Sequence, residues 1–345
     1  MKRIGIITFN RAINYGALLQ SFALKKTVEK YESCVVINYK NLYIENLYNP
    51  QGKVKAILKK LFYKKRINRF KNFIAGFSTK EIYEKQNIHL LGFEKIITGS
   101  DQVWNMDCSG NDETYLLPDC IKARKYSYAA SFGKSQLSNN QIDVFKKKLE
   151  QFRYISVREK TGQIICQSQL GVSAEVCLDP TLLLSKQEWK ENLNIATNRK
   201  KYILLFVFNL TPEIKKLAIQ LKKKYKLPIY NLTLSSQCFF GNKVIRNAGP
   251  KEWVEMFYNA SFIITDSFHG TAFSINFNKQ FYSFAKNARA SRIIDLLELL
   301  QLNHRLNPTI VDLEVEKQIE YSQANLKLNM EREKSISFIE KIVND

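Results

Sequence analysis

The stretch Phe262–Phe284 (FIITDSFHGTAFSINFNKQFYSF) constrains most strongly what this chain can fold into. Its first four residues, Phe262–Thr265, have the length and apolar character of a buried parallel strand. A polar loop over 266–270 follows, and then a short predicted helix over 271–278 and a second strand over 281–284. This alternation of strand and helix is typical of an α/β domain with a parallel sheet.

The loop in this stretch has the properties of a binding site. In an open α/β sheet, ligands bind where a strand ends and the next helix begins. Free backbone N–H groups and the helix dipole favour an anion there. His269 lies in the loop and can carry a proton at neutral pH, so it is either a catalytic acid or a histidine that only hydrogen-bonds the backbone. Asp266 either orients the imidazole or caps the helix.

The chain begins with the same alternation: a strand over 2–9, a helix over 17–30 and a strand over 34–39. This βαβ pattern predicts a Rossmann-like domain, although the intervening loop has one glycine and no dinucleotide fingerprint. A second series of strands and helices starts at 202–208. Three regions are therefore expected: an N-terminal Rossmann-like domain over 1–190, a C-terminal Rossmann-like domain over 191–310 and a helical segment over 311–345.

The composition is that of a globular protein, with 45% hydrophobic and 25% charged residues in a chain of 345. No apolar run has the length of a membrane span, and the first apolar run is too short for a signal peptide. We therefore expect a cytoplasmic protein. The six cysteines are scattered without a C-x-x-C pair and only three histidines accompany them, which predicts neither a metal site nor a disulfide framework.

The formal charge of +21 indicates an anionic partner, or else lysines that are merely solvated. The segment 53–73 is rich in basic residues, has no acidic one, and carries apolar residues at helical spacing. It has two interpretations: peripheral contact with an anionic membrane, or a surface helix packed on its own domain. No nucleic-acid-binding module is present in the sequence, so no nucleic-acid partner is expected.

Six motifs in order resemble the polysaccharide pyruvyl transferase family: NYGALLQSFALKKTV, ITGSDQVWN, SYAASFG, ISVREKTG, LDPTLLL and TDSFHGTAFSI. The resemblance extends from about Ile4 to about Arg305. It implies a GT-B-like architecture, α/β with two Rossmann-like domains facing across a cleft. It also implies transfer of a pyruvyl group from phosphoenolpyruvate, without a further cofactor, to two hydroxyls of a sugar. The product would be a cyclic ketal on a cell-surface polysaccharide or its lipid-linked precursor.

The resemblance suggests which residues bind the donor. Phosphoenolpyruvate carries a phosphate and a carboxylate, and its pocket therefore needs cations. Arg158 matches the arginine of the family's S-x-R-[DE] motif, but it could instead pair with Glu159 or another acid. Many family members have an arginine two residues before the motif histidine, where this chain has a serine, and Arg292 is the expected substitute unless it lies on the surface. The donor-side candidates are Arg158, Ser267, Gly270, Arg289 and Arg292.

The remaining candidates concern the chemistry and the acceptor. His269 matches the motif histidine, which would protonate the methylene carbon of the donor. Asp101 would accept a proton from an acceptor hydroxyl, or only stabilise its own turn. Trp104 would stack on a sugar ring or belong to the core. The acceptor-side candidates are Asn14, Tyr15, Gly16, Gln102 and Trp104.

Two other functions fit the same features. A GT-B-like glycosyltransferase would use a nucleotide-sugar, although the missing glycine fingerprint disfavours it. A non-catalytic protein that binds an anionic glycan would keep the fold but lose the donor site. The serine in place of the family arginine and the high positive charge favour this last alternative.

Overall fold

The computed structural model describes residues 4–48, 54–233, 238–285, 290–309 and 318–345. The chain divides into two compact units: unit 1 comprises Met1–Leu183 and Glu331–Asp345, and unit 2 comprises Leu184–Met330. The sequence placed the boundary after residue 190. The expected separate segment 311–345 is instead shared between the units, because the long helix α13 (Tyr321–Asn344) begins in unit 2 and ends in unit 1.

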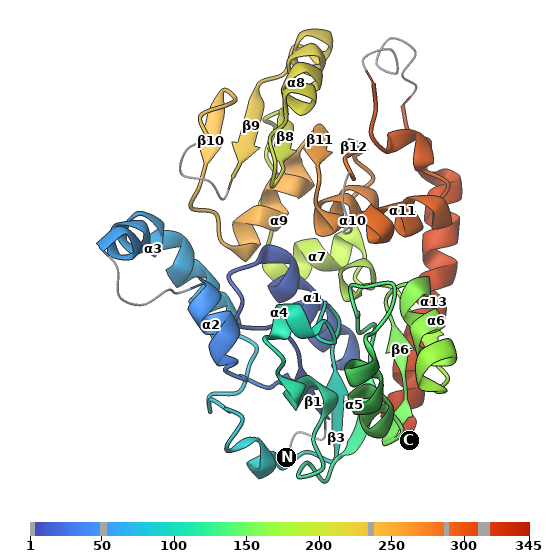
Figure 1. Ribbon diagram of the computed structural model, residues 1–345. Coiled ribbons are helices and arrows are strands. Elements are labelled where there is room, and N and C mark those ends of the chain that lie inside the picture. Colours follow the sequence, from blue (N-terminus) through green and yellow to red (C-terminus); the bar gives the residue numbers. More distant parts are fainter. Residues whose placement is uncertain (1–3, 49–53, 234–237, 286–289, 310–317) are drawn as a thin grey trace. The chain divides into compact units, whose positions relative to one another are not determined.

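The described part of unit 1 contains a parallel five-stranded sheet in the order β2-β1-β3-β4-β5. Figure 1 labels two of its strands, β1 and β3. The strands of the sheet are β1 (Ile4–Ile7), β2 (Cys34–Val36), β3 (Lys95–Thr98), β4 (Arg124–Ser127) and β5 (Phe152–Tyr154). Successive strands add first to one side of β1 and then, from β3 on, to the other. The switch point, where ligands bind in such sheets, therefore lies between β1 and β3.

Helix α1 (Tyr15–Val28) follows β1 and is buried on almost all sides. It is covered in part by α3 (Val54–Ala75), whose Phe70 ring lies 5.1 Å from the Tyr15 ring, centroid to centroid. In the half of α3 whose side chains are described, the apolar side thus packs on unit 1 itself. Lys64, Lys65 and Lys71 are exposed on the other side. This arrangement agrees with one of the two interpretations of the basic segment 53–73, a surface helix packed on its own domain.

Other elements of unit 1 are shorter. They are the helices α2 (Leu42–Tyr48), α4 (Met106–Ser109), α5 (Asn139–Leu149) and α6 (Lys160–Ile164), and a small parallel pair of strands, β6 (Ser156–Val157) and β7 (Glu175–Val176). The β6–β7 pair extends the edge of the unit at which the candidate Arg158 lies.

The described part of unit 2 repeats the architecture, with a parallel sheet in the order β10-β9-β8-β11-β12. The strands are β8 (Ile203–Phe206), β9 (Ile229–Leu232), β10 (Lys243–Ile245), β11 (Phe262–Thr265) and β12 (Gln280–Ser283). The helices are α7 (Lys186–Leu193), α8 (Pro212–Tyr225), α9 (Pro250–Asn259), α10 (Phe268–Asn276) and α11 (Ala290–Leu299). The switch point of this sheet lies between β8 and β11.

Helix α10 begins three residues before its predicted start, because Ser267 caps it. The Ser267 hydroxyl accepts a hydrogen bond from the Gly270 N–H at 3.3 Å, which completes the first turn. His269 therefore lies in the first turn of a helix and not in a loop. The strand before it, β11, has the predicted bounds.

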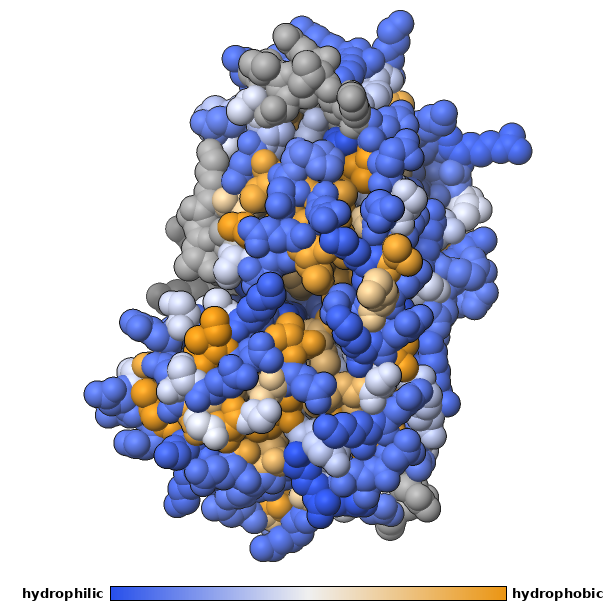
Figure 2. Space-filling model, turned by 90° about the vertical axis from the view of Figure 1, so that its right-hand side faces the viewer, coloured by the Kyte–Doolittle hydropathy of each residue, from blue (hydrophilic) through white to orange (hydrophobic). Residues whose placement is uncertain are grey.

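The face of the molecule drawn in Figure 2 is mostly hydrophilic, with hydrophobic side chains in scattered groups. This distribution is ordinary for the surface of a globular protein. Among the helices of the described residues, none combines the length and the apolar character needed to cross a bilayer.

Candidate active site

The loops at the carboxyl edge of the unit 1 sheet are joined to one another beyond the ends of their strands. The N–H of Ser131, after β4, donates to the carbonyl of Asp101, after β3, at 3.0 Å. The N–H of Arg158, after β6, donates to the carbonyl of Ala130 at 3.1 Å. Asp101 has a φ of 78°, a strained left-handed conformation for a residue with a side chain. These bonds hold three polar side chains at one edge of the sheet.

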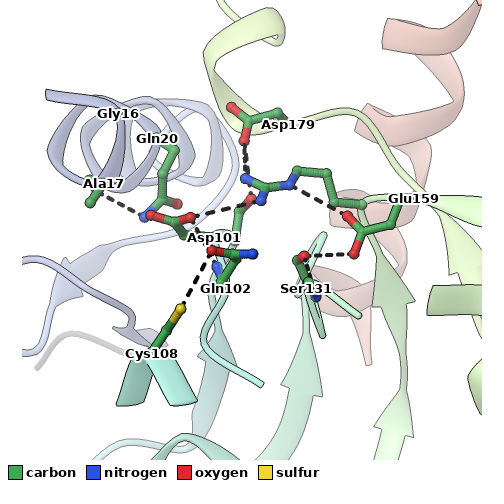
Figure 3. A network of polar contacts seen from close by, with 12 residues as sticks. Gly16, Ala17, Gln20, Asp101, Gln102, Cys108, Ser131, Glu159 and Asp179 are labelled. Carbon is green, nitrogen blue, oxygen red and sulfur yellow. Dashed lines mark hydrogen bonds and ion pairs between the residues drawn. The ribbon is translucent and has the colours of Figure 1, made fainter. Parts of the chain in front are cut away.

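Three carboxylates that Figure 3 labels, those of Asp101, Glu159 and Asp179, form a network of ion pairs with the guanidinium of Arg158. Its Nη1 is 2.9 Å from Asp179 Oδ2, and its Nη2 and Nε are each 3.7 Å from a carboxylate oxygen, of Asp101 and Glu159 respectively. The Arg158 side chain is only 2% exposed. Burial lowers the pKa of this guanidinium, but the three carboxylates, Asp179 foremost, outweigh burial and raise the pKa above its ordinary value.

The carboxylates of this network are themselves held in place. Asp179 accepts hydrogen bonds from the N–H and the hydroxyl of Thr181, at 3.0 and 2.7 Å. Glu159 accepts one from the Ser131 hydroxyl at 2.6 Å. Asp179 thus fixes a turn and also binds Arg158. Since three carboxylates surround one guanidinium, the local charge is negative. Arg158 is therefore paired with acids, which is the alternative to donor binding that the sequence left open.

Asp101 is the most accessible carboxylate of the network, with a side chain that is 13% exposed. Its Oδ1 accepts a hydrogen bond from the Gln102 N–H at 2.9 Å, so it does stabilise its own turn. The Gln102 side chain lies against Gly133, where an added Cβ would come within 2.0 Å of Gln102 Nε2. Gly133 also has a φ of 62°, and glycine is therefore required at this point of the site.

Asn14 and Gly16 form the start of helix α1. The Asn14 side chain accepts hydrogen bonds from the N–H groups of Gly16 and Ala17, at 3.0 and 3.4 Å, and caps the helix. Asn14 remains partly exposed, whereas Tyr15 is only 3% exposed and packs on α3. Of these acceptor candidates, only Asn14 presents a side chain at the surface.

Trp104 belongs to the core of unit 1 and is 1% exposed. Its ring packs on Phe132 at 5.2 Å between centroids, and its indole N–H donates to the Tyr115 carbonyl at 3.3 Å. A ring enclosed in this way does not reach a sugar, so the core interpretation of Trp104 is the one that fits.

In unit 2, helix α10 packs unusually close to strand β11. A Cβ added at Gly270 would lie 2.2 Å from the Thr265 hydroxyl oxygen, so only glycine fits there. The Thr265 hydroxyl also accepts a hydrogen bond from the Ser267 N–H at 3.1 Å. Gly270 therefore determines how closely the first turn of α10, with His269, approaches the end of the strand.

Asp266 joins the two loops at the switch point of unit 2. Its two carboxylate oxygens accept hydrogen bonds from the N–H groups of Phe208 and Asn209, at 2.7 and 3.0 Å. The helix-capping role that the sequence offered for Asp266 belongs to Ser267 instead. The structure thus shows a role that the sequence could not indicate, since Phe208 lies 58 residues away along the chain.

His269 is partly exposed, and its ring lies 5.2 Å from that of Phe268. The guanidinium of Arg292, from α11, lies over the same Phe268 ring at 5.9 Å. Phe268 therefore links the predicted acid to the predicted substitute cation, both at the N-terminal end of α10. Arg289 lies outside the residues that the structure describes.

No group of three or more His, Cys, Asp or Glu side chains is placed to hold a metal ion within the described ranges. The candidate chemistry of both units consists of carboxylate, imidazole, amide and guanidinium groups. Such groups carry out proton transfer and bind anions.

Solved structures define the fold class. The chain is similar to an S. aureus MnaA–UDP complex, with a TM-score of 0.55 and 13% identity, over 100% of this chain and 97% of the other. It is also similar to the UDP-GlcNAc 2-epimerase of Methanocaldococcus jannaschii, with a TM-score of 0.50 and 13% identity, over 96% and 92% of the two chains. These neighbours have the GT-B fold of sugar enzymes, and the predicted fold class is confirmed.

The family follows from the sequence. The model of the polysaccharide pyruvyl transferase family matches residues 14–287, and the chain belongs to this family. Membership makes the protein a transferase and confirms the resemblance carried by the six motifs. A search of curated protein sequences found no match.

Proposed function

We propose that this protein transfers a pyruvyl group from phosphoenolpyruvate to two hydroxyls of a saccharide and releases phosphate. Membership of the family supports the reaction class. The observation that carries the donor assignment is the first turn of α10, where His269 and Arg292 flank Phe268. The dipole of this helix adds to the attraction for an anion. Arg292 supplies the cation that Ser267 does not.

The proposed chemistry needs one acid and one base. His269, as imidazolium, donates a proton to the methylene carbon of the donor, and the central carbon becomes electrophilic. An acceptor hydroxyl adds to that carbon and gives its proton to Asp101. Phosphate then leaves as the second hydroxyl adds and closes the ketal. Protonation by His269 turns the methylene carbon into a methyl group. One of the two hydroxyl protons then restores the proton that His269 has lost, and the other leaves with phosphate.

Arg158 acts in this proposal as a positioning residue. Its guanidinium forms ion pairs with both Asp179 and Asp101 and so orients the Asp101 carboxylate. The strained backbone of Asp101 supports a functional role for this position. We assign the acceptor to unit 1 and the donor to unit 2, and we expect the reaction to take place in the cytoplasm on a cell-envelope precursor.

The test is phosphate release from phosphoenolpyruvate in the presence of a panel of saccharides. His269→Gln should lower the rate by about 10²- to 10⁴-fold, which is the usual contribution of a general acid. His304→Gln is the matched control, because His304 is exposed and lies outside α10. If no phosphoenolpyruvate binds to the wild-type protein in calorimetry, or if His269→Gln transfers at the wild-type rate, the assignment is wrong.

Arg292→Gln tests the substitute cation separately. We expect a rise in KM for phosphoenolpyruvate of about tenfold or more, because a charge-assisted contact contributes about 1.5–3 kcal/mol. Arg246→Gln is the control, since Arg246 also lies over a phenylalanine ring, that of Phe239, at 5.1 Å, but outside α10 and α11. An equal effect of both changes would show that Arg292 does not bind the donor.

A further inference from the structure

Arg66 of helix α3 is a cation that the proposed reaction does not use. It lies on the inner side of α3, three residues after the buried Tyr63 and four before the buried Phe70. Its guanidinium carbon is 4.3 Å from the centre of the Tyr63 ring. Its Nε and Nη1 are buried and have no hydrogen-bond partner among the described residues.

Such an arginine needs an anion. Buried N–H groups of a guanidinium are costly unless they are paired, and native proteins nearly always pair them. The sequence of α3 and of the segment before it, 49–75, contains no aspartate or glutamate that could serve. The donors of Arg66 are therefore suited to an anion that comes from outside the chain.

The packing of α3 on α1 shows where this anion would lie. Phe70 contacts Tyr15, the first residue of α1, and further along both helices Phe73 contacts Phe22, with ring centroids 5.3 Å apart. The two helices therefore run in the same direction. Arg66 precedes Phe70 by about one turn, roughly 6 Å along the axis. This step places it beside the N-terminal end of α1, where the helix dipole is positive.

A second side chain of the same region also lacks partners. Asn10 lies in the loop from β1 into α1 and is 1% exposed. Neither Nδ2 nor Oδ1 of Asn10 has a hydrogen-bond partner in the described part of the chain. This loop adjoins the Asp101 loop, since the Thr8 hydroxyl donates to the Ser100 carbonyl at 2.8 Å. Unpaired donors thus belong both to the helix that packs on the start of α1 and to the loop that precedes α1, and this loop adjoins the loop of the proposed base.

We propose that Arg66 and the loop before α1 bind a phosphate group carried by the saccharide acceptor. The identity of the acceptor rests on the proposed function, whereas the anion subsite rests only on unit 1. The acceptor would be a sugar phosphoester, and its source would be a nucleoside diphosphate sugar or a lipid-linked diphosphate sugar. The bound phosphate would hold the sugar hydroxyls near Asp101.

Binding of inorganic pyrophosphate to the full-length protein, measured by calorimetry, tests the subsite without any catalysis. Arg66→Gln should weaken binding by at least tenfold, and Asn10→Asp should weaken it as well because it adds a like charge. Lys65→Gln is the matched control: it removes the same charge from the exposed side of the same helix. Absence of binding to the wild-type protein, or equal weakening by Arg66→Gln and Lys65→Gln, would overturn the proposal.

Pyruvyl transfer to one saccharide in three forms then identifies the source: free, linked to a nucleoside diphosphate, and linked to a polyprenyl diphosphate. Arg66→Gln should lower kcat/KM at least tenfold for the preferred phosphorylated form and leave the free sugar unaffected. Transfer that is equal for all forms, without pyrophosphate binding, would refute the subsite and leave the proposed function standing. Pyrophosphate binding that depends on Arg66, without transfer to any form, would refute the proposed function alone.

Arg66→Lys guards against a folding defect. It keeps the charge but loses the planar fork, so binding of pyrophosphate should fall between those of the wild-type protein and Arg66→Gln. Thermal unfolding of each variant should remain close to that of the wild-type protein, because Arg66 pairs with no acid among the described residues. If Arg66→Gln loses both pyrophosphate binding and its folded structure, Arg66→Lys takes its place in the comparison with the wild-type protein.

Discussion

Nη1 of Arg158 donates to Oδ2 of Asp179 across 2.9 Å, and the two side chains are 2% and 0% exposed. This pair joins the loop after β6 to the turn after β7 at the carboxyl edge of the unit 1 sheet. A guanidinium that is buried and already paired with carboxylates cannot also receive a substrate. The pair therefore indicates that Arg158 positions other residues of the site and does not bind the substrate itself.

Arg158→Gln should lower the free energy of unfolding by about 3–5 kcal/mol, because it leaves buried carboxylates without their counter-charge. Arg153→Gln is the control: its side chain is 54% exposed, and its ion pair with Asp345 should contribute less than about 1 kcal/mol. Urea unfolding of both variants distinguishes these values. Wild-type stability of Arg158→Gln, with only a raised KM for phosphoenolpyruvate, would return Arg158 to the donor site.

Gly270→Ala should destabilise the protein by about 1–3 kcal/mol, since the new methyl group overlaps the Thr265 side chain. Activity should fall as well, because His269 is the preceding residue. Thr265→Ala in the same protein removes the closest atom and should restore part of the stability. Gly92→Ala is the control, as none of the described residues comes within 4 Å of its added Cβ. Similar unfolding of the Gly270→Ala and Gly92→Ala variants would contradict the close packing of α10.

Asp266→Asn should cost about 1.5–3 kcal/mol, because an amide offers one oxygen to the two backbone N–H groups that the carboxylate now serves. The contacts with Phe208 and Asn209 predict a loss of stability without a shift of the pH–rate profile. The measurement is unfolding in urea together with kcat/KM from pH 5 to 9. A shifted profile in a stable variant would show instead that Asp266 acts on the imidazole of His269.

Lys279 makes the stability of unit 2 depend on pH. Burial, and then the nearby Lys186, lower the pKa of Lys279 to about 8 from its ordinary 10.5. Between these two pH values the unfolded chain binds more protons than the folded one, so stability should rise as the pH increases from 8 to 10.5. Below pH 8 both states are charged and the cost of burying the charge is fully present.

Lys279→Met should remove this dependence. Urea unfolding at pH 7.5, 8.5 and 9.5 should show a smaller rise in stability for Lys279→Met than for the wild-type protein. Lys216→Met is the control, since Lys216 is exposed on α8 and its loss should leave the slope unchanged. Parallel curves for Lys279→Met and the wild-type protein would mean that Lys279 keeps an ordinary pKa.

The fold was largely predictable from the sequence because its strands are short apolar runs that end at polar loops. The bounds of β11 coincide with those predicted. The starts of helices were less predictable, since a capping residue such as Ser267 looks like part of a loop until its hydroxyl is seen to bind the helix. The sequence could identify residues near strand ends, but not which of them face outward: Trp104 and Asn14 come from similar loops, and of the two only Asn14 is partly exposed.

Contacts between segments that are distant along the chain could not be predicted from the sequence. Asp179 lies 21 residues from Arg158, and only the paired loops of the folded unit bring their side chains together. Arg66 did leave a signal in the sequence, because it occupies a position on the apolar side of a basic helix, between Tyr63 and Phe70. A charged residue at such a position is worth examining for a ligand.

Helix α13 has a consequence for synthesis of the protein on the ribosome. Its last residues complete unit 1, where the Lys95 ammonium group donates to the carbonyls of Ile342 and Val343 at 3.0 and 2.6 Å. The first unit to emerge during translation therefore lacks one of its helices until all of unit 2 has been made. Unit 2 is continuous in sequence and can fold while unit 1 still waits, so the order of completion is the reverse of the order of synthesis.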